Sequence, residues 1–263
     1  MIRPFSLAFS LLLFVLGSGP ADGQTRLLDD FDQAAGERLV DHQWTLIRGG
    51  TDIVYTDGGL AFSVYPHSDV GNAAGLIADG GQEVRRPFGA RTDGAVYAAF
   101  LVQMQTVSDV FNDGIFFYLG PDDTTIFNRF ATIYANEDGA GNVRFGIRKG
   151  SGISFTGYDY ALGTTYLLVL KYQFLPDTDD DLLSLWIDPD LNELEALVPP
   201  KVTTDSGGDA PGIAEVVLSQ ISGGPTATLD GLHISTAWEL PLAVFLDGFE
   251  TADTSSWSSV VVD

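Results

Sequence analysis

Four acidic residues stand within five positions in the segment Asp177-Thr178-Asp179-Asp180-Asp181. Calcium binds hard oxygen ligands, chiefly carboxylates and backbone carbonyls. The alternation of Asp177, Asp179 and Asp181 therefore predicts a calcium site, with a solvated acidic loop as the alternative. The segment is not an EF-hand, because Leu182 stands where that loop needs glycine.

Aromatic side chains predict a second kind of site, because sugars stack on aromatic rings. Tyr158 and Tyr160 alternate with an aspartate in Gly-Tyr-Asp-Tyr. Trp186 is expected to share an outward sheet face with Tyr166 and Tyr172, since side chains alternate along a strand. These rings predict a sugar-binding surface, and the alternative is that they fill the core.

Arg86 belongs to a pair of adjacent basic residues, Arg85-Arg86. It is a candidate ligand-binding residue for an acidic or polar group. In a chain with a net charge of −23, a salt-bridge donor is the alternative interpretation.

Catalytic motifs are weak in this chain. Asp205-Ser206-Gly207-Gly208 matches part of the trypsin-like nucleophile motif, but no histidine stands in a matching context. Single histidines at 42, 67 and 233 do not predict a zinc site. We therefore predict no catalytic residue, and these motifs favour a non-catalytic protein while leaving an enzyme as an open alternative.

The composition narrows the classes of partner. Acidic residues outnumber basic ones 36 to 13. That excess argues against nucleic acid as the main partner, because phosphate binding needs clustered lysine and arginine. The chain has no cysteine, which excludes disulfides and thiolate metal sites, and 45% hydrophobic residues are enough for a folded core.

The candidate site residues must be positioned by the secondary structure of the chain. Short runs rich in Val, Ile, Phe, Tyr and Thr alternate with segments of Gly, Asp and Asn. This pattern predicts an all-β chain: an antiparallel β-sandwich of two sheets, or jelly roll. The expected strands are Asp52–Tyr55, Leu60–Tyr65, Glu83–Phe88, Ala95–Gln105, Gly114–Leu119, Phe130–Ala135, Val143–Arg148, Thr164–Phe174, Leu182–Asp188, Ile213–Ile221 and Leu229–Trp238.

The two ends of the chain differ from the middle. Arg3, an apolar run from Leu7 to Leu16 and small residues after it are typical of a secretory signal peptide, here residues 1–23. A sandwich domain is expected over 24–240. Residues 241–263, with Asp247-Gly248-Phe249-Glu250, are expected to form a C-terminal tail or sorting segment. The mature chain has no apolar stretch long enough to span a membrane.

The opening Asp29-Asp30-Phe31-Asp32, the middle Leu183-Ser184-Leu185-Trp186-Ile187-Asp188 and the closing Leu229-Asp230-Gly231-Leu232-His233 resemble a known family. They are similar to the concanavalin A-like lectin/glucanase (laminin G-like) jelly rolls of secreted bacterial proteins, over about residues 26–239. The resemblance implies neighbouring first and last strands. It also implies a structural calcium near the joined termini, at Asp30 and Asp230. The glucanase motif Glu-x-Asp-x-x-Glu is absent.

Together these features predict a secreted or cell-surface protein that binds a glycan or a surface polymer without catalysis, as a lectin or adhesin does. One alternative is a glycoside hydrolase or polysaccharide lyase of the same fold, which needs two carboxylates, or a basic and an aromatic residue, converging in the concave groove. Another alternative is a structural protein of the envelope or matrix.

Overall fold

The computed structural model describes residues 24–110, 114–122, 129–221 and 223–238. In these residues the regular elements are β-strands and two short 3-10 helices, η1 (Leu39–Asp41) and η2 (Glu195–Leu197). No helix in the described part of the chain is long and apolar enough to cross a membrane. The predicted signal peptide (1–23) and tail (241–263) lie outside the described residues.

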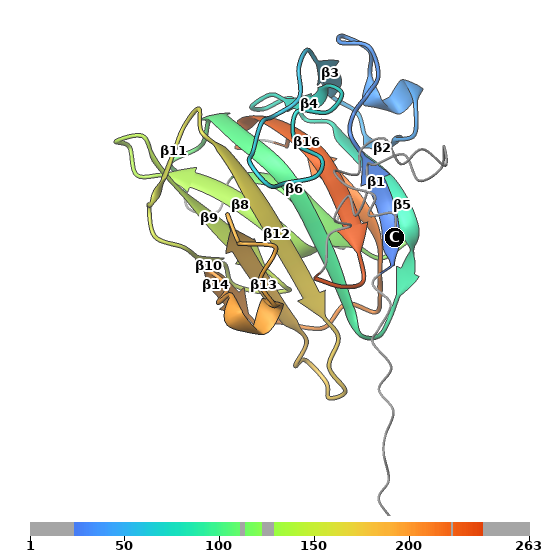
Figure 1. Cartoon of the computed structure of the whole chain (residues 1–263), viewed down its shortest axis with the longest axis vertical. Coiled ribbons are helices and arrows are strands. Elements are labelled where there is room, and N and C mark those ends of the chain that lie inside the picture. Colours follow the sequence, from blue (N-terminus) through green and yellow to red (C-terminus); the bar gives the residue numbers. More distant parts are fainter. Residues whose placement is uncertain (1–23, 111–113, 123–128, 222, 239–263) are drawn as a thin grey trace, which may run out of the picture.

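One layer of the molecule is an antiparallel sheet, here called sheet A (Figure 1). Its strands follow the order β14-β13-β12-β6-β16-β4-β3, and β1 pairs with β16 beside this path. The bounds are β1 Thr25–Asp29, β3 Val54–Thr56, β4 Ala73–Leu76, β6 Ala95–Thr106, β12 Thr165–Gln173, β13 Leu182–Ile187, β14 Val202–Thr204 and β16 Thr226–Ser235.

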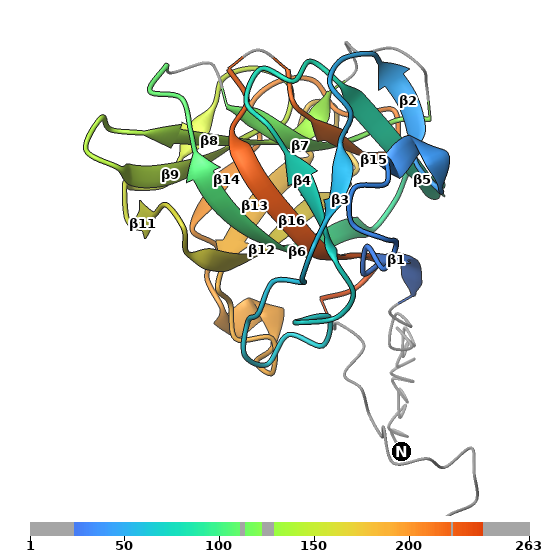
Figure 2. The ribbon, with the colours of Figure 1, turned by 90° about the horizontal axis from the view of Figure 1, so that it is seen from above.

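The other layer, sheet B, is also antiparallel. Its strands follow the order β10-β9-β8-β7-β15-β5-β2, and β11 pairs with β9. The bounds are β2 Thr45–Arg48, β5 Glu83–Arg91, β7 Ile115–Gly120, β8 Phe130–Glu137, β9 Asn142–Arg148, β10 Ser154–Phe155, β11 Tyr160–Ala161 and β15 Ile213–Ser219. Seen from above, strands β7, β8 and β15 of sheet B form a layer next to strands β6, β12 and β16 of sheet A (Figure 2). The predicted two-sheet antiparallel sandwich is thereby confirmed.

The core lies between the inner faces of the two sheets. Alternation along β12 turns Leu168, Leu170 and Tyr172 into this core, while Leu167 and Val169 face outward. The expectation that Tyr172 lies on the outward face is wrong. Its ring fills the core, and its hydroxyl donates to Asp181 Oδ2 at 2.7 Å.

The first and last strands are neighbours, as the resemblance implied. β1 pairs antiparallel with β16, with Leu27 opposite Ile234 and Asp29 opposite Leu232. Backbone pairing between β1 and β16 thus joins the two ends of the described chain. The candidate calcium ligands Asp30 and Asp230 therefore lie in the same region.

The outer face of sheet A is covered by loops. Leu60 and Tyr65 from one loop and Trp238 from the chain end pack on Leu167 and Trp186. The predicted strand Leu60–Tyr65 is wrong, because this segment turns: Val64 takes a φ of 65° and the backbone N–H of Tyr65 bonds to Phe62. Covering of this kind leaves little of this face for a ligand.

Candidate functional site

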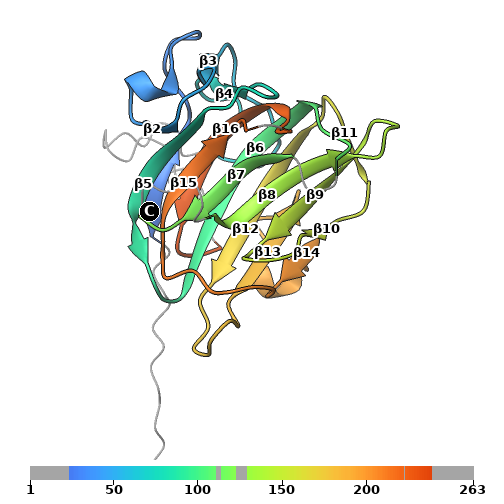
Figure 3. The same cartoon turned by 180° about the vertical axis from the view of Figure 1, so that it is seen from behind.

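A row of outward side chains crosses sheet B, whose strands lie side by side in Figure 3. The register places Arg85 opposite Val217, Val217 opposite Tyr118, Tyr118 opposite Thr132 and Thr132 opposite Arg148. Directly opposed residues in antiparallel strands share a face. Five strands therefore place two arginines, a tyrosine and a threonine in one line on the outer face.

Two buried carboxylates lie among these arginines. Arg85 Nη1 is 2.8 Å from Glu215 Oε2, and Arg129 Nη2 is 3.0 Å from Glu83 Oε1. Glu83 is fully buried and Glu215 is 4% exposed. Each carboxylate is matched with an arginine, which is how proteins retain buried charge.

Several polar atoms on this face are buried and have no hydrogen-bond partner among the described residues. They are the hydroxyls of Thr132 and Tyr134, Glu83 Oε2 and Arg148 Nε. Buried polar groups are nearly always satisfied in folded proteins, so such atoms need water or a ligand. Their gathering on one face marks it as a candidate binding site.

Tyrosine rings support two of the guanidinium groups. Arg148 lies over the ring of Tyr134, 5.3 Å from its centroid, and Arg129 lies over Tyr118 at 5.6 Å. Burial raises the pKa of the Tyr134 hydroxyl, and the charges of Arg148 and Arg129 oppose that rise. Burial and the charge of Glu83 raise the pKa of Tyr118. Both hydroxyls are therefore protonated at neutral pH.

Tyr158, a predicted sugar-binding residue, lies at the edge of this face. The guanidinium of Arg144 is 4.5 Å from the Tyr158 ring centroid and 3.9 Å from that of Phe155. Phe155 lies against the backbone at Gly146, where a Cβ atom would be 2.5 Å from its ring. Glycine is needed there because a side chain would displace the aromatic ring.

We call this surface the arginine face. It gathers four of the chain's 13 lysine and arginine residues. The chain carries a net charge of −23, so this local positive charge departs from the rest of the protein and favours an anionic ligand. Its members are Glu83, Arg85, Tyr118, Arg129, Thr132, Tyr134, Arg144, Arg148, Phe155, Tyr158 and Glu215.

Trp186 and Tyr160 lie elsewhere. Trp186 is buried on the outer side of sheet A, and its Nε1 donates to the Val198 carbonyl at 2.7 Å. Tyr160 packs against the core, 5.2 Å from the ring centroids of both Phe145 and Tyr166. The structure does not bring these two rings together with Tyr158 on one surface, and their binding role stays a prediction.

Arg86 and Asp30 line one cavity of about 320 Å³ beside β1. Arg86 is paired with Asp29 and also donates to Gln43. Asp30 Oδ1 lies 3.1 Å from His67 Nδ1. Arg86 is thus matched with Asp29, and Asp30 faces His67, so these residues hold β1 against β5 and the loop that carries His67.

Asp230, the other acid of the implied calcium site, is fully buried. Its oxygens accept the backbone N–H groups of Leu60 at 2.6 Å and Gly231 at 2.7 Å. Burial raises its pKa to about 7, although these hydrogen bonds oppose the rise. In the described residues Asp30 and Asp230 belong to no group of three metal-type ligands, and their calcium role stays a prediction.

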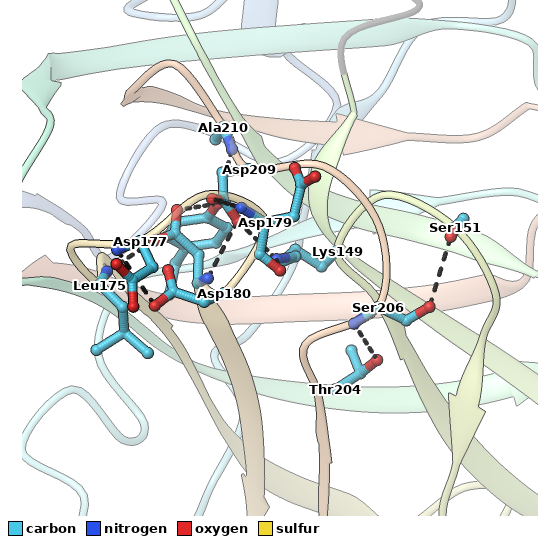
Figure 4. A network of polar contacts seen from close by, with 12 residues as sticks. Lys149, Ser151, Leu175, Asp177, Asp179, Asp180, Thr204, Ser206, Asp209 and Ala210 are labelled. Carbon is cyan, nitrogen blue, oxygen red and sulfur yellow. Dashed lines mark hydrogen bonds and ion pairs between the residues drawn. The ribbon is translucent and has the colours of Figure 1, made fainter.

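The acidic loop is organised around a lysine (Figure 4). Carboxylate oxygens of Asp180, Asp181 and Asp209 lie within 4.8 Å of one another. Lys149 is fully buried, and its Nζ lies 2.6 Å from Asp209 Oδ1 and 3.3 Å from the Asp179 carbonyl. The ammonium group of Lys149 thus supplies the positive charge that balances the carboxylate of Asp209. Asp209 was not predicted, and of Asp177, Asp179 and Asp181 only Asp181 contributes a carboxylate to the group.

Two histidines that are far apart in the sequence meet at the joined chain ends. The rings of His67 and His233 are 5.7 Å apart between centroids. His233 Nε2 lies 3.0 Å from Thr25 Oγ1, and burial lowers the pKa of His233 to about 4. Nothing in the local sequence around either histidine indicates this pairing.

Sequence reasoning missed most of the arginine face. Its only local signal is alternation: Arg144 stands between the core residues Val143 and Phe145, and Arg148 follows the core residue Ile147. Similar alternation sets Glu83 and Arg85 around the core residue Val84. Which strands lie next to each other is not a local property, so the row is visible only in the fold.

No protein-family model matches this chain, and no curated protein matches it. Solved structures similar to it include the globular domain of T. cruzi calreticulin (10% identity, TM-score 0.48, 81% of this chain and 88% of that chain). Others are an endo-β-1,4-glucuronan lyase from the fungus Trichoderma reesei (9%, TM-score 0.44, 82% and 97%) and an endo-1,3-β-glucanase from Streptomyces sioyaensis (11%, TM-score 0.44, 83% and 98%). They are jelly rolls of the class that the sequence resembles.

Proposed function

We propose that this protein binds an acidic polysaccharide of the uronate type across the arginine face. The observation that carries the proposal is the gathering of four arginines on one outer sheet face, among buried polar atoms that form no hydrogen bond within the described part of the chain. Arginine recognises carboxylates through its planar donors, and tyrosine rings stack on sugars. An acidic glycan offers both kinds of partner.

The size of the row favours a polymer over a single sugar. Arg85 and Arg148 stand on β5 and β9, four strand spacings apart. With neighbouring strands about 4.8 Å apart, the two positions are separated by roughly 19 Å. One sugar ring cannot reach both arginines, so the ligand has several units.

A binding panel tests the proposal. The mature protein is titrated calorimetrically with polymannuronate, polygalacturonate, a neutral glucan and a neutral mannan. We expect binding to at least one acidic polymer and none to the neutral ones. Arg148→Ala should weaken the binding about 10- to 100-fold. Arg38→Ala removes the same charge from an exposed pair with Asp41 and should keep it. Equal binding of neutral and acidic polymers would refute the proposal.

Cleavage by β-elimination is a second candidate. It is favoured by the Tyr134 hydroxyl beside Arg148, which has no hydrogen-bond partner in the residues that the structure describes. Arg148 would neutralise a uronate carboxylate, which acidifies the hydrogen on the adjacent carbon. A base takes that proton, a C=C bond forms and the glycosidic C–O bond breaks. The Tyr134 hydroxyl then donates its proton to the departing oxygen. Ultraviolet absorbance of the unsaturated product distinguishes cleavage from binding alone.

A glycosidase with paired carboxylates is less favoured. Glu83 is opposite Ser219, four residues beyond Glu215 on β15, so the two backbone positions are roughly 13 Å apart along the strands. Hydrolysis needs carboxyl groups about 5–9.5 Å apart. Each of the two is also held by its own arginine.

We also propose, from the sequence alone, that the protein is exported and acts as a secreted or cell-surface component. The apolar run Leu7–Leu16 supports this. Amino-terminal sequencing of the protein recovered from the medium of a secreting host should show cleavage near residue 23. Recovery of the intact chain inside the cell would contradict it.

A further inference from the structure

Glu83 is held rigidly on the arginine face. Its side chain is fully buried, and its Oε1 accepts from Arg129 Nη2 at 3.0 Å and from Ser219 Oγ at 3.0 Å. Ser219 is directly opposite Glu83 on β15. Two donors on one oxygen fix the direction in which the other oxygen points.

The second oxygen, Oε2, is buried and accepts no hydrogen bond within the described ranges of the chain. The donors of Arg129 and Ser219 named above are directed at Oε1. Leaving a buried carboxylate oxygen without a donor is unfavourable. A donor that does not belong to these residues is therefore needed at this point.

The chemistry of the site selects the kind of donor. A carboxylate only accepts hydrogen bonds. The charge of Glu83 is already matched by Arg129, so a neutral donor fits better than a second cation. In an acidic glycan the neutral donors are hydroxyl groups on the ring that carries the carboxylate.

We propose that Glu83 accepts a hydrogen bond from a free hydroxyl of the glycan unit bound at Arg129, and so selects against units that are O-acetylated there. An ester has no hydrogen to donate, and its acyl group adds bulk beside a fully buried side chain. This inference rests on the proposed function and adds a substrate requirement to it.

The test compares polymannuronate and polygalacturonate with their chemically O-acetylated forms. We expect acetylation to weaken binding to the wild-type protein about tenfold or more. Glu83→Gln replaces the accepting oxygen with an amide that can donate, and should bind both forms within about twofold. Glu83→Asp withdraws the carboxylate by one methylene and should show a smaller preference, which covers the case in which Glu83→Gln does not fold.

Two matched variants isolate the role of Oε2. Glu215→Gln alters the other buried carboxylate, paired with Arg85, and should lower affinity for both forms while keeping their ratio. Ser219→Ala removes a donor to Oε1 only and should also keep the ratio. Equal wild-type affinity for both forms, or an unchanged preference in Glu83→Gln, would overturn the inference. Binding of neither form by the wild type would instead overturn the proposed function.

Discussion

The guanidinium of Arg148 lies over the ring of Tyr134, 5.3 Å from its centroid, and no described carboxylate forms an ion pair with it. The other two arginines at the centre of the arginine face, Arg85 and Arg129, are both paired with glutamates. Arg148 therefore keeps its charge available for a ligand, while the tyrosine ring fixes its position.

Replacing Tyr134 separates the role of its hydroxyl from that of its ring. Tyr134→Phe should weaken binding of the acidic polymer about fivefold, the effect of one neutral hydrogen bond of about 1 kcal/mol. Arg148→Ala should lower the affinity for the acidic polymer about 10- to 100-fold, because a charged hydrogen-bond donor is lost. Calorimetric titration measures both. Thermal melting of Tyr134→Phe should be unchanged, since the hydroxyl has no hydrogen-bond partner among the described residues.

Ionic strength should control the affinity. The proposed contacts are between arginines and carboxylates, so binding should weaken steadily as sodium chloride rises from about 0.05 M to about 0.5 M. Arg148→Ala should show a shallower dependence, because one charge contact is missing. Salt-independent binding would point to stacking and neutral hydrogen bonds as the main contacts.

Lys149 should stabilise the acidic loop in the way a metal does. Lys149→Met leaves Asp209 without its counter-charge and should destabilise the fold by about 3–5 kcal/mol in urea titration. Millimolar calcium should restore part of that stability in the variant, through the oxygens of Asp180, Asp181 and Asp209. Lys171→Met, which removes a pair with Glu195, should show no calcium response. An equal calcium effect on both variants would contradict this prediction.

Asp230 should make stability depend on pH. Burial raises its folded pKa to about 7, against about 3.9 in the unfolded chain. The folded state therefore keeps a proton that the unfolded chain releases, and the resulting stabilisation is lost as pH rises from about 4 to about 7. The free energy of unfolding of Asp230→Asn, measured relative to that of the wild type, should therefore increase by about 4 kcal/mol between about pH 4 and about pH 7.

The measurement is the difference in free energy of unfolding between these two proteins at each pH. A difference is needed because His233, with a pKa lowered to about 4, contributes a slope of opposite sign between about pH 4 and 6.5. A flat difference would show that Asp230 ionises normally in the fold.

Local patterns predicted the strands that have a clear alternation or a clear turn. Glu83–Phe88 lies within β5, and Phe130–Ala135 lies within β8. The segment Leu60–Tyr65 has a strand-like composition but folds back as a loop, because its apolar side chains cover the outer face of sheet A. Burial against a distant surface overrode local propensity there.

The sequence by itself determined the all-β architecture, the acidic excess and the alternation of side chains between the two faces of each strand, since these follow from composition and from a period of two residues. Only the tertiary structure decided which strands are neighbours and in what register. Arg85 and Glu215 are 130 positions apart, yet they form an ion pair because β5 and β15 are adjacent. A long-range pairing of this kind is fixed by packing of the whole core, so no local pattern contains it.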